Sequence, residues 1–229
     1  MHDYILTSET DKEPATDSPK KEDTAKNKDK YWNGDNNEIE TKVVDNHIYY
    51  YSSVNKKSAL ELNMKLKEVE NKLIKKYNDY NGHQEYIYLH INSFGGSVFS
   101  AFSVIDTIKN SKIPVVSIIE GAAASAATLI SVMCDYRIIY ENSYMLIHQL
   151  SSGTWGKMSE LEDEMENLKE LMTAIRKIYK ESTNIPDGEI NEILKHDLWW
   201  NPQICLQKGL VDEIKTTEKK YNFSRGLIV

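Results

Sequence analysis

The stretch that most constrains the fold is an alanine-rich turn, Gly121–Thr128, which follows the apolar run Val115–Ile119. A short β-branched run closed by a glycine is typical of a buried strand that ends in a sharp turn. Alanine is the strongest helix former, so a helix should begin near Ser125. Such a serine presents its hydroxyl at a helix N-terminus, where backbone N–H groups favour negative charge. Serine acyl transfer needs this placement because its intermediate carries an oxyanion, although packing is the commoner role of a small residue in such a turn.

Two further strand-like runs also end in residues that can carry chemistry. The run Tyr86–Ile91 leads into Asn92–Ser97, which contains the pair Gly95-Gly96. A glycine pair permits positive φ angles and lets backbone N–H groups approach a ligand closely. The run Tyr144–His148 ends on a histidine. A donor turn, a nucleophile and a base are therefore expected together at strand C-termini, where ligand sites form in open α/β sheets.

The spacing of apolar residues predicts repeated strand–helix units, which call for a parallel sheet with right-handed crossovers. The expected strands are 47–52, 86–92, 115–120, 136–140, 144–148 and 210–214. The expected helices are 97–110, 125–132 and 158–182, one beginning at Ser58 and two shorter ones opening at Asp187 and at Asn201-Pro202. The fold class predicted from this order is α/β.

Three segments, in this order and at these separations, resemble the signature segments of the Clp protease proteolytic subunit. They are Ile91–Gly96, Gly121–Ala126 and Met145–Gln149, and the similarity extends from Asn46 to Ile214. The resemblance implies a ClpP/crotonase-like fold of repeated β-β-α or β-α-β units with a protruding handle helix. It also implies a serine endopeptidase that degrades unfolded polypeptides inside a ring-shaped chamber.

The chemistry of such an enzyme needs a nucleophile, a base and a carboxylate that holds the base in the correct tautomer. Ser125 would attack the scissile carbonyl and His148 would take its proton. The candidates for the carboxylate are Asp187, Asp197 and Asp212. Asp187 is better explained as a helix cap, and Asp212, in a Gly-Leu-Val-Asp strand ending, is better explained by a structural role.

Asp197 occupies the position that resembles the catalytic aspartate of the family. The neighbouring rings of Trp199 and Trp200 are expected to keep water away from it, and His196 is expected at the surface. The chain order Ser–His–Asp agrees with the Clp family and differs from the chymotrypsin, subtilisin and α/β-hydrolase orders.

The resemblance also assigns binding roles. The oxyanion hole would be formed by the backbone N–H groups of Gly96 and Ala126. An edge strand would pair with an extended peptide, and the expected substrate-binding residues are Gly95, Gln149, Leu150, Ser151, Ser152 and Gly153. Leu150 and Ser152 depart from the proline and the glycine pair usual there, and Phe94 replaces the proline usual before Gly95.

The composition limits the classes of partner. The chain has 229 residues and a net charge of −7. No Lys/Arg cluster in it is dense enough to suggest binding to nucleic acid or to an acidic membrane surface. No apolar run approaches the roughly 18–20 residues of a membrane span, and the N-terminus has no signal-peptide core. The only cysteines, Cys134 and Cys205, are expected as buried free thiols. This favours a reducing compartment, and a cytoplasmic location is expected.

The chain divides into three parts by composition. Residues 1–43 are polar and almost free of aliphatic side chains after Leu6, so a disordered tail is expected. Residues 44–215 form the expected peptidase domain. Residues 216–229 are a C-terminal extension that carries no recognised motif.

The expected helix 158–182 carries an apolar seam at alternating spacings of four and three. Its members are Leu161, Met165, Leu168, Met172, Ile175 and Tyr179. The seam permits packing on the chain's own sheet and equally suits pairing with another helix. In the Clp family the matching helix is the handle by which two rings interlock, which favours a contact between subunits.

The resemblance implies two stacked heptameric rings, an AAA+ unfoldase ATPase as partner, and unfolded polypeptides as substrates. No cofactor or metal is expected in this chain, because ATP is used only by the partner. Three alternatives stay open: a crotonase-like acyl-CoA enzyme, a non-catalytic ring subunit, and a Ser–Lys peptidase like signal peptide peptidase A. For the Ser–Lys peptidase the available lysines are Lys169, Lys177 and Lys180.

Overall fold

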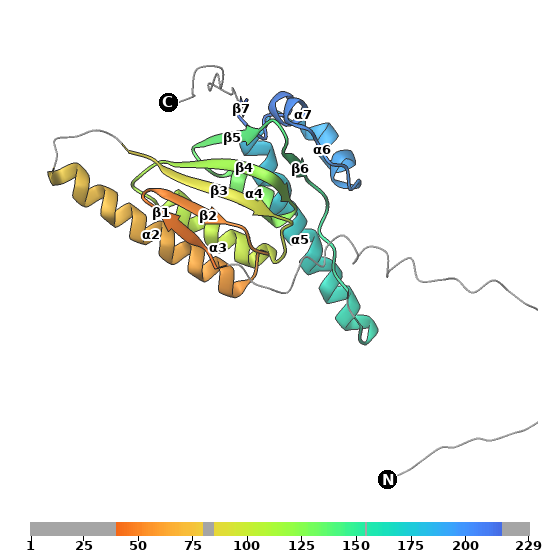
Figure 1. Cartoon of the computed structure of the whole chain (residues 1–229). Coiled ribbons are helices and arrows are strands. Elements are labelled where there is room, and N and C mark those ends of the chain that lie inside the picture. The colour runs from red at the N-terminus through yellow and green to blue at the C-terminus, as the bar shows by residue number, and fades with distance from the viewer. Residues whose placement is uncertain (1–39, 80–84, 154, 217–229) are drawn as a thin grey trace, which may run out of the picture. The chain divides into compact units, whose positions relative to one another are not determined.

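The computed structural model describes residues 40–79, 85–153 and 155–216, and these build a seven-stranded sheet with helices packed on it (Figure 1). The strands are β1 (Lys42–Val44), β2 (His47–Tyr50), β3 (Ile87–Ser93), β4 (Val115–Ala124), β5 (Tyr136–Tyr140), β6 (Tyr144–Leu146) and β7 (Glu213–Lys215). Their order is β1-β2-β3-β4-β5-β7, and β6 pairs with β4. Only β1–β2 is antiparallel among the described pairs, so the predicted parallel α/β fold is confirmed.

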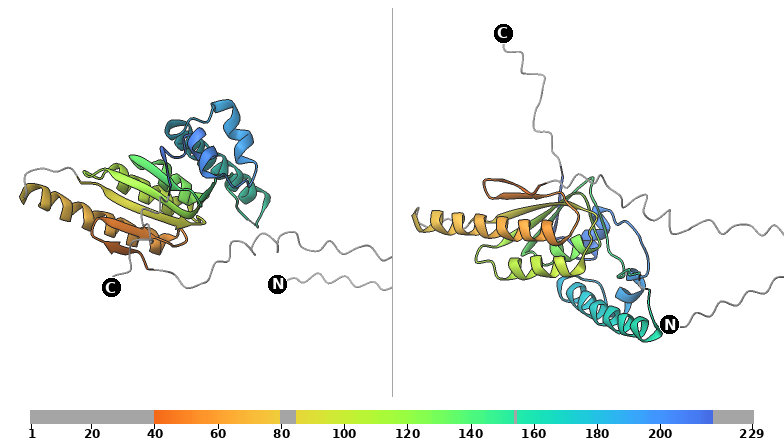
Figure 2. Two further views of the ribbon diagram at one scale, coloured as in Figure 1. Left: turned by 45° about the horizontal axis from the view of Figure 1, so that its top comes forward. Right: turned by 90° about the horizontal axis from the view of Figure 1, so that it is seen from below.

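Parallel strands need long crossovers, and helices provide them here. The helices are α2 (Lys56–Asp79), α3 (Val98–Lys109), α4 (Ala126–Val132), α5 (Met158–Ser182), α6 (Asp187–Leu194) and α7 (Pro202–Gln207). The helices α2, α3 and α4 lie along one face of the sheet (Figures 1 and 2). The apolar stripe of α2, formed by Leu62, Leu66, Val69 and Leu73, is buried. None of the described helices is long and apolar enough to cross a membrane.

The first strand begins earlier than the sequence predicts. Strand β1 starts at Lys42, two residues before the expected domain boundary, and the backbone N–H of the buried Thr41 donates to Glu61 on α2 (2.8 Å). Residues 40–43 therefore belong to the folded domain. The remainder of the predicted disordered tail, 1–39, and the extension from 217 onward lie outside the described residues.

Strand β4 does not end in a turn at Gly121, which corrects the sequence prediction. It continues to Ala124, because Ala122–Ala124 pair in parallel with Tyr144–Leu146 of β6. The first part of β4 is buried on both sides, as is typical of a central parallel strand. The second part carries the chain directly to Ser125, so a strand rather than a loop positions this serine.

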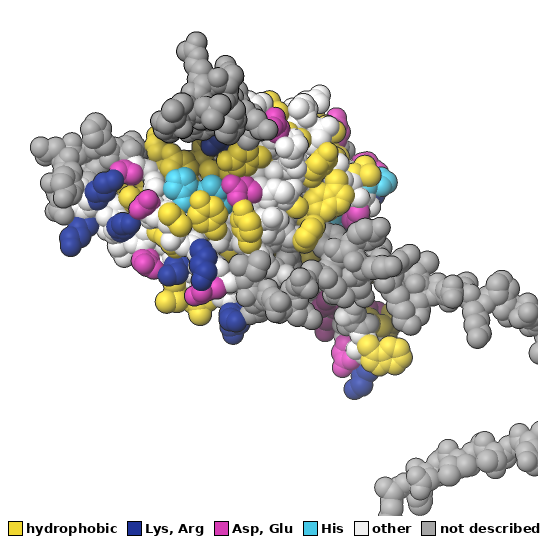
Figure 3. All heavy atoms as spheres, in the orientation of Figure 1, with side chains coloured by type: hydrophobic (Ala, Val, Ile, Leu, Met, Phe, Trp, Pro, Cys, Tyr) yellow, Lys and Arg dark blue, Asp and Glu magenta, His cyan; other side chains and the backbone are white. Residues whose placement is uncertain are grey.

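Histidine side chains lie beside hydrophobic and acidic ones on the opposite face of the sheet (Figure 3). The Nδ1 atom of His47 lies 2.8 Å from Nε2 of His90, and Nδ1 of His90 lies 2.7 Å from a carboxylate oxygen of Glu120. Tyr51 donates to the same carboxylate, and the ring of Tyr49 stacks on His90. Burial, with His90 beside it, lowers the pKa of His47. None of these residues belongs to the predicted site.

Helix α5 has the predicted bounds but is only half covered by its own chain. Ile175 and Tyr179 near its C-terminus are buried. Leu161 and Met165 in its N-terminal half are exposed, Met165 at 54%. This half extends away from the sheet in Figure 1, so the two ends of the predicted apolar seam have different surroundings.

Candidate active site

Ser125 lies at a sharp elbow between β4 and α4. Its backbone has φ 54° and ψ −127°, in a region that L-residues rarely adopt. The backbone N–H of Ser125 donates to the carbonyl of Leu146 (2.9 Å), and the hydroxyl of Thr128 donates to the carbonyl of Ser125 (2.6 Å). Helix α4 begins at Ala126, one residue after the predicted start, and Ser125 is its N-cap. The strained elbow is thus fixed by β6 and by the first turn of α4.

The glycine turn after β3 packs directly against this elbow. A Cβ atom on Gly95 would lie 2.7 Å from Cβ of Ser125 and 2.5 Å from the carbonyl oxygen of Ala124, so only glycine fits. The neighbouring Gly96 forms a parallel bridge to Val54, which uses the N–H groups of Val54 and Ser97. In a parallel bridge the N–H of Gly96 then points to the side away from Val54.

His148 and Asp197, far apart in the sequence, are brought into contact. Nδ1 of His148 lies 3.2 Å from Oδ1 of Asp197, and the histidine side chain is 17% exposed. His148 follows β6 by two residues, so the predicted strand 144–148 ends early, at Leu146. The carbonyl of Leu146, the last residue of the same strand, accepts the hydrogen bond from the backbone N–H of Ser125. One short strand therefore helps to position both Ser125 and His148.

The prediction that two tryptophans shield Asp197 from water is wrong. The Asp197 side chain is 53% exposed. Trp200 is held in an antiparallel bridge by two backbone hydrogen bonds with Met145 (2.7 and 3.0 Å). Trp199 instead packs its ring edge-to-face on Phe94. The side chain of Trp200 is partly buried against the hydrophobic core and that of Trp199 packs on Phe94, while more than half of the Asp197 side chain is open to solvent.

The two other candidate aspartates have structural partners. Asp212 accepts hydrogen bonds from Nε and Nη2 of Arg137 (2.9 and 2.6 Å), as its predicted structural role requires. Asp187 is the first residue of α6 and pairs with Lys180 (2.7 Å). The N-cap of α6 is Pro186, so the prediction of Asp187 as a cap is wrong by one position. Arg137 and Lys180 thus engage these two carboxylates, whereas the carboxylate of Asp197 lies against His148.

The segment expected to bind the peptide is not a strand. Residues 149–153 have no regular secondary structure. The N–H of Gln149 donates to the carbonyl of Leu194 (2.6 Å), and the N–H of Leu150 lies 3.2 Å from Sδ of Met172. These contacts hold the segment to α6 and α5, which corrects the expectation of an edge strand. His196, expected at the surface, is exposed.

The lysines required by the Ser–Lys alternative are directed to other partners. Lys169 pairs with Glu166 (2.7 Å) and Lys177 with Glu181 (3.9 Å), and the three lysine side chains on α5 are 57–72% exposed. A lysine base must be desolvated to lose its proton near neutral pH. The structure therefore disfavours this alternative.

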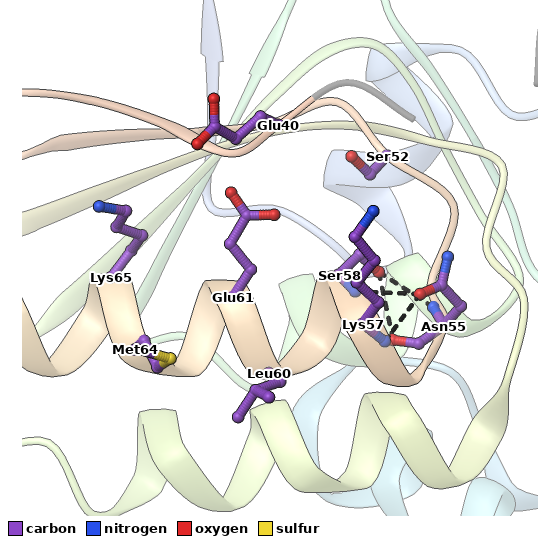
Figure 4. Close-up of a pocket in the computed structure, with 9 residues that line it drawn as sticks. All are labelled: Glu40, Ser52, Asn55, Lys57, Ser58, Leu60, Glu61, Met64 and Lys65. Atoms are coloured by element: carbon purple, nitrogen blue, oxygen red, sulfur yellow. Dashed lines mark hydrogen bonds between the residues drawn. The ribbon is translucent and has the colours of Figure 1, made fainter. Parts of the chain in front are cut away.

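A further pocket lies away from the predicted site, and the described residues form no metal cluster. Among the described residues, no group of three or more His, Cys, Asp or Glu side chains could hold a metal ion. A pocket of about 540 Å³ lies beside α2, and its lining includes Glu61, Met64 and Lys65 (Figure 4). None of the predicted site residues lines it.

The contact between Phe94 and Trp199 was missed by sequence reasoning. The sequence shows Phe94 only as a departure from a family pattern, and Trp199 only as a neighbour of Asp197. No local signal connects them, because the two residues come from different elements that only the folded sheet brings together.

Comparisons with known proteins agree on one family. A family model described as Clp protease matches residues 38–218. The proteolytic subunit 2 of the ATP-dependent Clp protease of Treponema denticola is 32% identical over 135 residues, 58% of this chain and 68% of the relative. The corresponding subunit of Streptococcus mutans is 33% identical over 132 residues, 56% of this chain and 67% of the relative. A solved structure of a ClpP1 mutant from Listeria monocytogenes has the same fold, with a TM-score of 0.66 and 23% identity over 76% of this chain and 93% of that one.

Proposed function

The chain belongs to the Clp protease family and is a Clp-type serine peptidase, and from this premise we propose that Ser125, His148 and Asp197 cleave peptide bonds of unfolded polypeptides. The single observation that carries the assignment is the 3.2 Å contact between Nδ1 of His148 and Oδ1 of Asp197. It engages one ring nitrogen of the histidine with a carboxylate, which is how a triad orients its base.

The first half of the reaction forms an acyl-enzyme. Oγ of Ser125 attacks the scissile carbonyl carbon while Nε2 of His148 accepts the hydroxyl proton. The tetrahedral intermediate collapses when the histidine returns this proton to the leaving amine. Water then attacks the ester, with His148 again as base, and releases the carboxylate product. Asp197 accepts the Nδ1–H of the imidazole throughout and stabilises the imidazolium that forms twice in the cycle.

The developing oxyanion would be bound by the backbone N–H groups of Gly96 and Ala126. Two features support this assignment. Ala126 opens α4, and the first N–H groups of a helix have no acceptor within it. The Gly95 turn packs on the Ser125 elbow, and the bridge to Val54 leaves the N–H of Gly96 directed to the other side. Removing one such donor typically slows acyl transfer by about 10²–10³-fold.

The assignment of Ser125 is tested by labelling with a fluorophosphonate probe and mapping the modified residue by mass spectrometry. We expect one adduct, on Ser125, and none in Ser125→Ala. Ser159→Ala is the matched control, because it removes an exposed serine hydroxyl at the start of α5. An adduct on another residue, or none in the assembled wild type, contradicts the proposal; the second result favours a non-catalytic ring subunit.

We propose further that the subunits stack as two heptameric rings fed by an AAA+ ATPase, and that this chain itself uses no cofactor. The exposed N-terminal half of α5, with Leu161 and Met165, supports a contact between rings. A peptidase of low selectivity also needs a chamber that excludes folded proteins. Both cysteines are free and buried, which supports a reducing compartment such as the cytoplasm.

A further inference from the structure

Phe94 and Trp199 form an aromatic pair beside the candidate active site. Their ring centroids are 6.0 Å apart and their planes are inclined by 88°, which is an edge-to-face arrangement. This geometry is favourable because the positive edge of one ring meets the negative face of the other. The two side chains are 43% and 42% exposed, so neither belongs to the hydrophobic core.

The pair joins the two sides of the site. Phe94 directly precedes Gly95, where an added Cβ would lie 2.7 Å from Cβ of Ser125. Trp199 follows Asp197 by two residues, and Asp197 lies 3.2 Å from His148. The ring contact therefore connects the turn that carries the oxyanion donor with the segment that carries the carboxylate.

The segment that carries Asp197 is irregular chain between two helices. Residues 195–201 connect the last residue of α6, Leu194, with the first of α7, Pro202. Trp200 is fixed to β6 by its two backbone hydrogen bonds with Met145. The half-exposed Asp197 lies three residues before this anchor, and between the two the Trp199 ring packs on Phe94, the residue that directly follows β3.

We propose that Phe94 and Trp199 are positioning residues for the triad. Their contact holds the Asp197 segment against the Gly95 turn. It therefore keeps the Asp197 carboxylate beside His148 and the oxyanion-donor turn beside Ser125. A shift of the carboxylate weakens its hold on the imidazole without changing any group that touches substrate. This inference rests on the proposed function, because it assumes that Ser125, His148 and Asp197 act together.

The test is a double-mutant cycle on the full-length assembled protein, with Phe94→Leu, Trp199→Leu and the double variant. Two fluorogenic peptides are used, with a large or a small apolar side chain before the scissile bond. We expect each single variant to lower kcat about 3- to 10-fold with KM unchanged for both peptides, as an edge-to-face pair of ordinary strength predicts. The double variant should be no slower than the slower single variant.

A second readout reports on the histidine. A carboxylate held close to an imidazole stabilises the protonated ring, so a looser Asp197 should move the acid limb of the kcat/KM profile to lower pH. The variants Trp199→Phe and Phe94→Tyr keep a ring at each position and should retain the wild-type profile. Phe99→Leu makes the same chemical change on an exposed phenylalanine of α3 and should also leave kcat unchanged.

Three results would overturn the inference. Multiplicative losses in the double variant would show that the two rings act independently, and variants that keep wild-type kcat would show that the contact is dispensable. A rise in KM for one peptide alone would show that the rings bind substrate instead. Fluorophosphonate labelling of the same samples distinguishes failure of the positioning role from failure of the proposed function. A wild type that is not labelled at Ser125 would refute the proposed function itself.

Discussion

Replacing Asp212 by asparagine should lower the melting temperature and leave kcat almost unchanged. The same change at Asp197 should lower kcat and leave the melting temperature almost unchanged. Asp212 accepts three hydrogen bonds from Arg137: one from the backbone N–H (2.9 Å), one from Nε (2.9 Å) and one from Nη2 (2.6 Å). The guanidinium also donates to the carbonyls of Ser182 and Gly209. This arginine thus ties β5 to the end of α5 and to the chain before β7.

The size of the effect follows from the burial of the pair. The Arg137 side chain is only 14% exposed, so Asp212→Asn leaves a poorly hydrated cation without its counter-charge. Breaking a fully buried pair costs about 3–5 kcal/mol, and the 31% exposure of Asp212 reduces this to about 2–3 kcal/mol. At roughly 2–4 °C per kcal/mol for a domain of this size, Tm should fall by about 4–12 °C.

Asp197→Asn should have the opposite profile. Its side chain is 53% exposed, so the free energy of unfolding should change by no more than about 0.5 kcal/mol. Its kcat should fall by up to about 10⁴-fold, because an asparagine favours the wrong imidazole tautomer.

Both variants are measured by calorimetry and by peptide hydrolysis at a temperature well below either Tm. Asp212→Asn should keep kcat within about threefold of wild type, an effect far smaller than the loss of a triad member. A loss of kcat in Asp212→Asn at an unchanged Tm would refute these roles, as would hydrolysis of peptide by Asp197→Asn at the wild-type rate.

Two further predictions concern assembly and thiol reactivity. The double variant Leu161→Lys, Met165→Lys changes two residues that the chain itself leaves exposed, and it should split the assembly into single rings because burying unpaired charge costs several kcal/mol. Native mass spectrometry should show half the wild-type mass for this variant and the full mass for the control Asn167→Lys. An unchanged mass in the double variant would contradict the ring contact. Burial raises the pKa of Cys134 and of Cys205 to about 12, so almost no thiolate is present at pH 8. Iodoacetamide should therefore modify neither cysteine before denaturation, which peptide mapping can check.

The sequence by itself determined the elements and the order of the chemical groups. Strand β5 and helix α5 have the predicted bounds, because an apolar period of two or of 3.6 is a local property of the chain. The helix start at Ala126 follows from the alanine run after a glycine. The three motif segments likewise lie at or just beyond the ends of β3, β4 and β6, because strand ends are where a parallel sheet turns.

Only the tertiary structure decided which groups meet. The sequence offered three aspartates, and packing brought Asp197 to His148 while Arg137 engaged Asp212. It also turned Trp199 onto Phe94 and left Asp197 open to solvent. Such contacts join residues that are distant in the chain, and they depend on how the sheet and helices pack rather than on any local periodicity. The sequence therefore predicts the edge of the sheet at which the site forms, and the packed fold decides which side chains complete it.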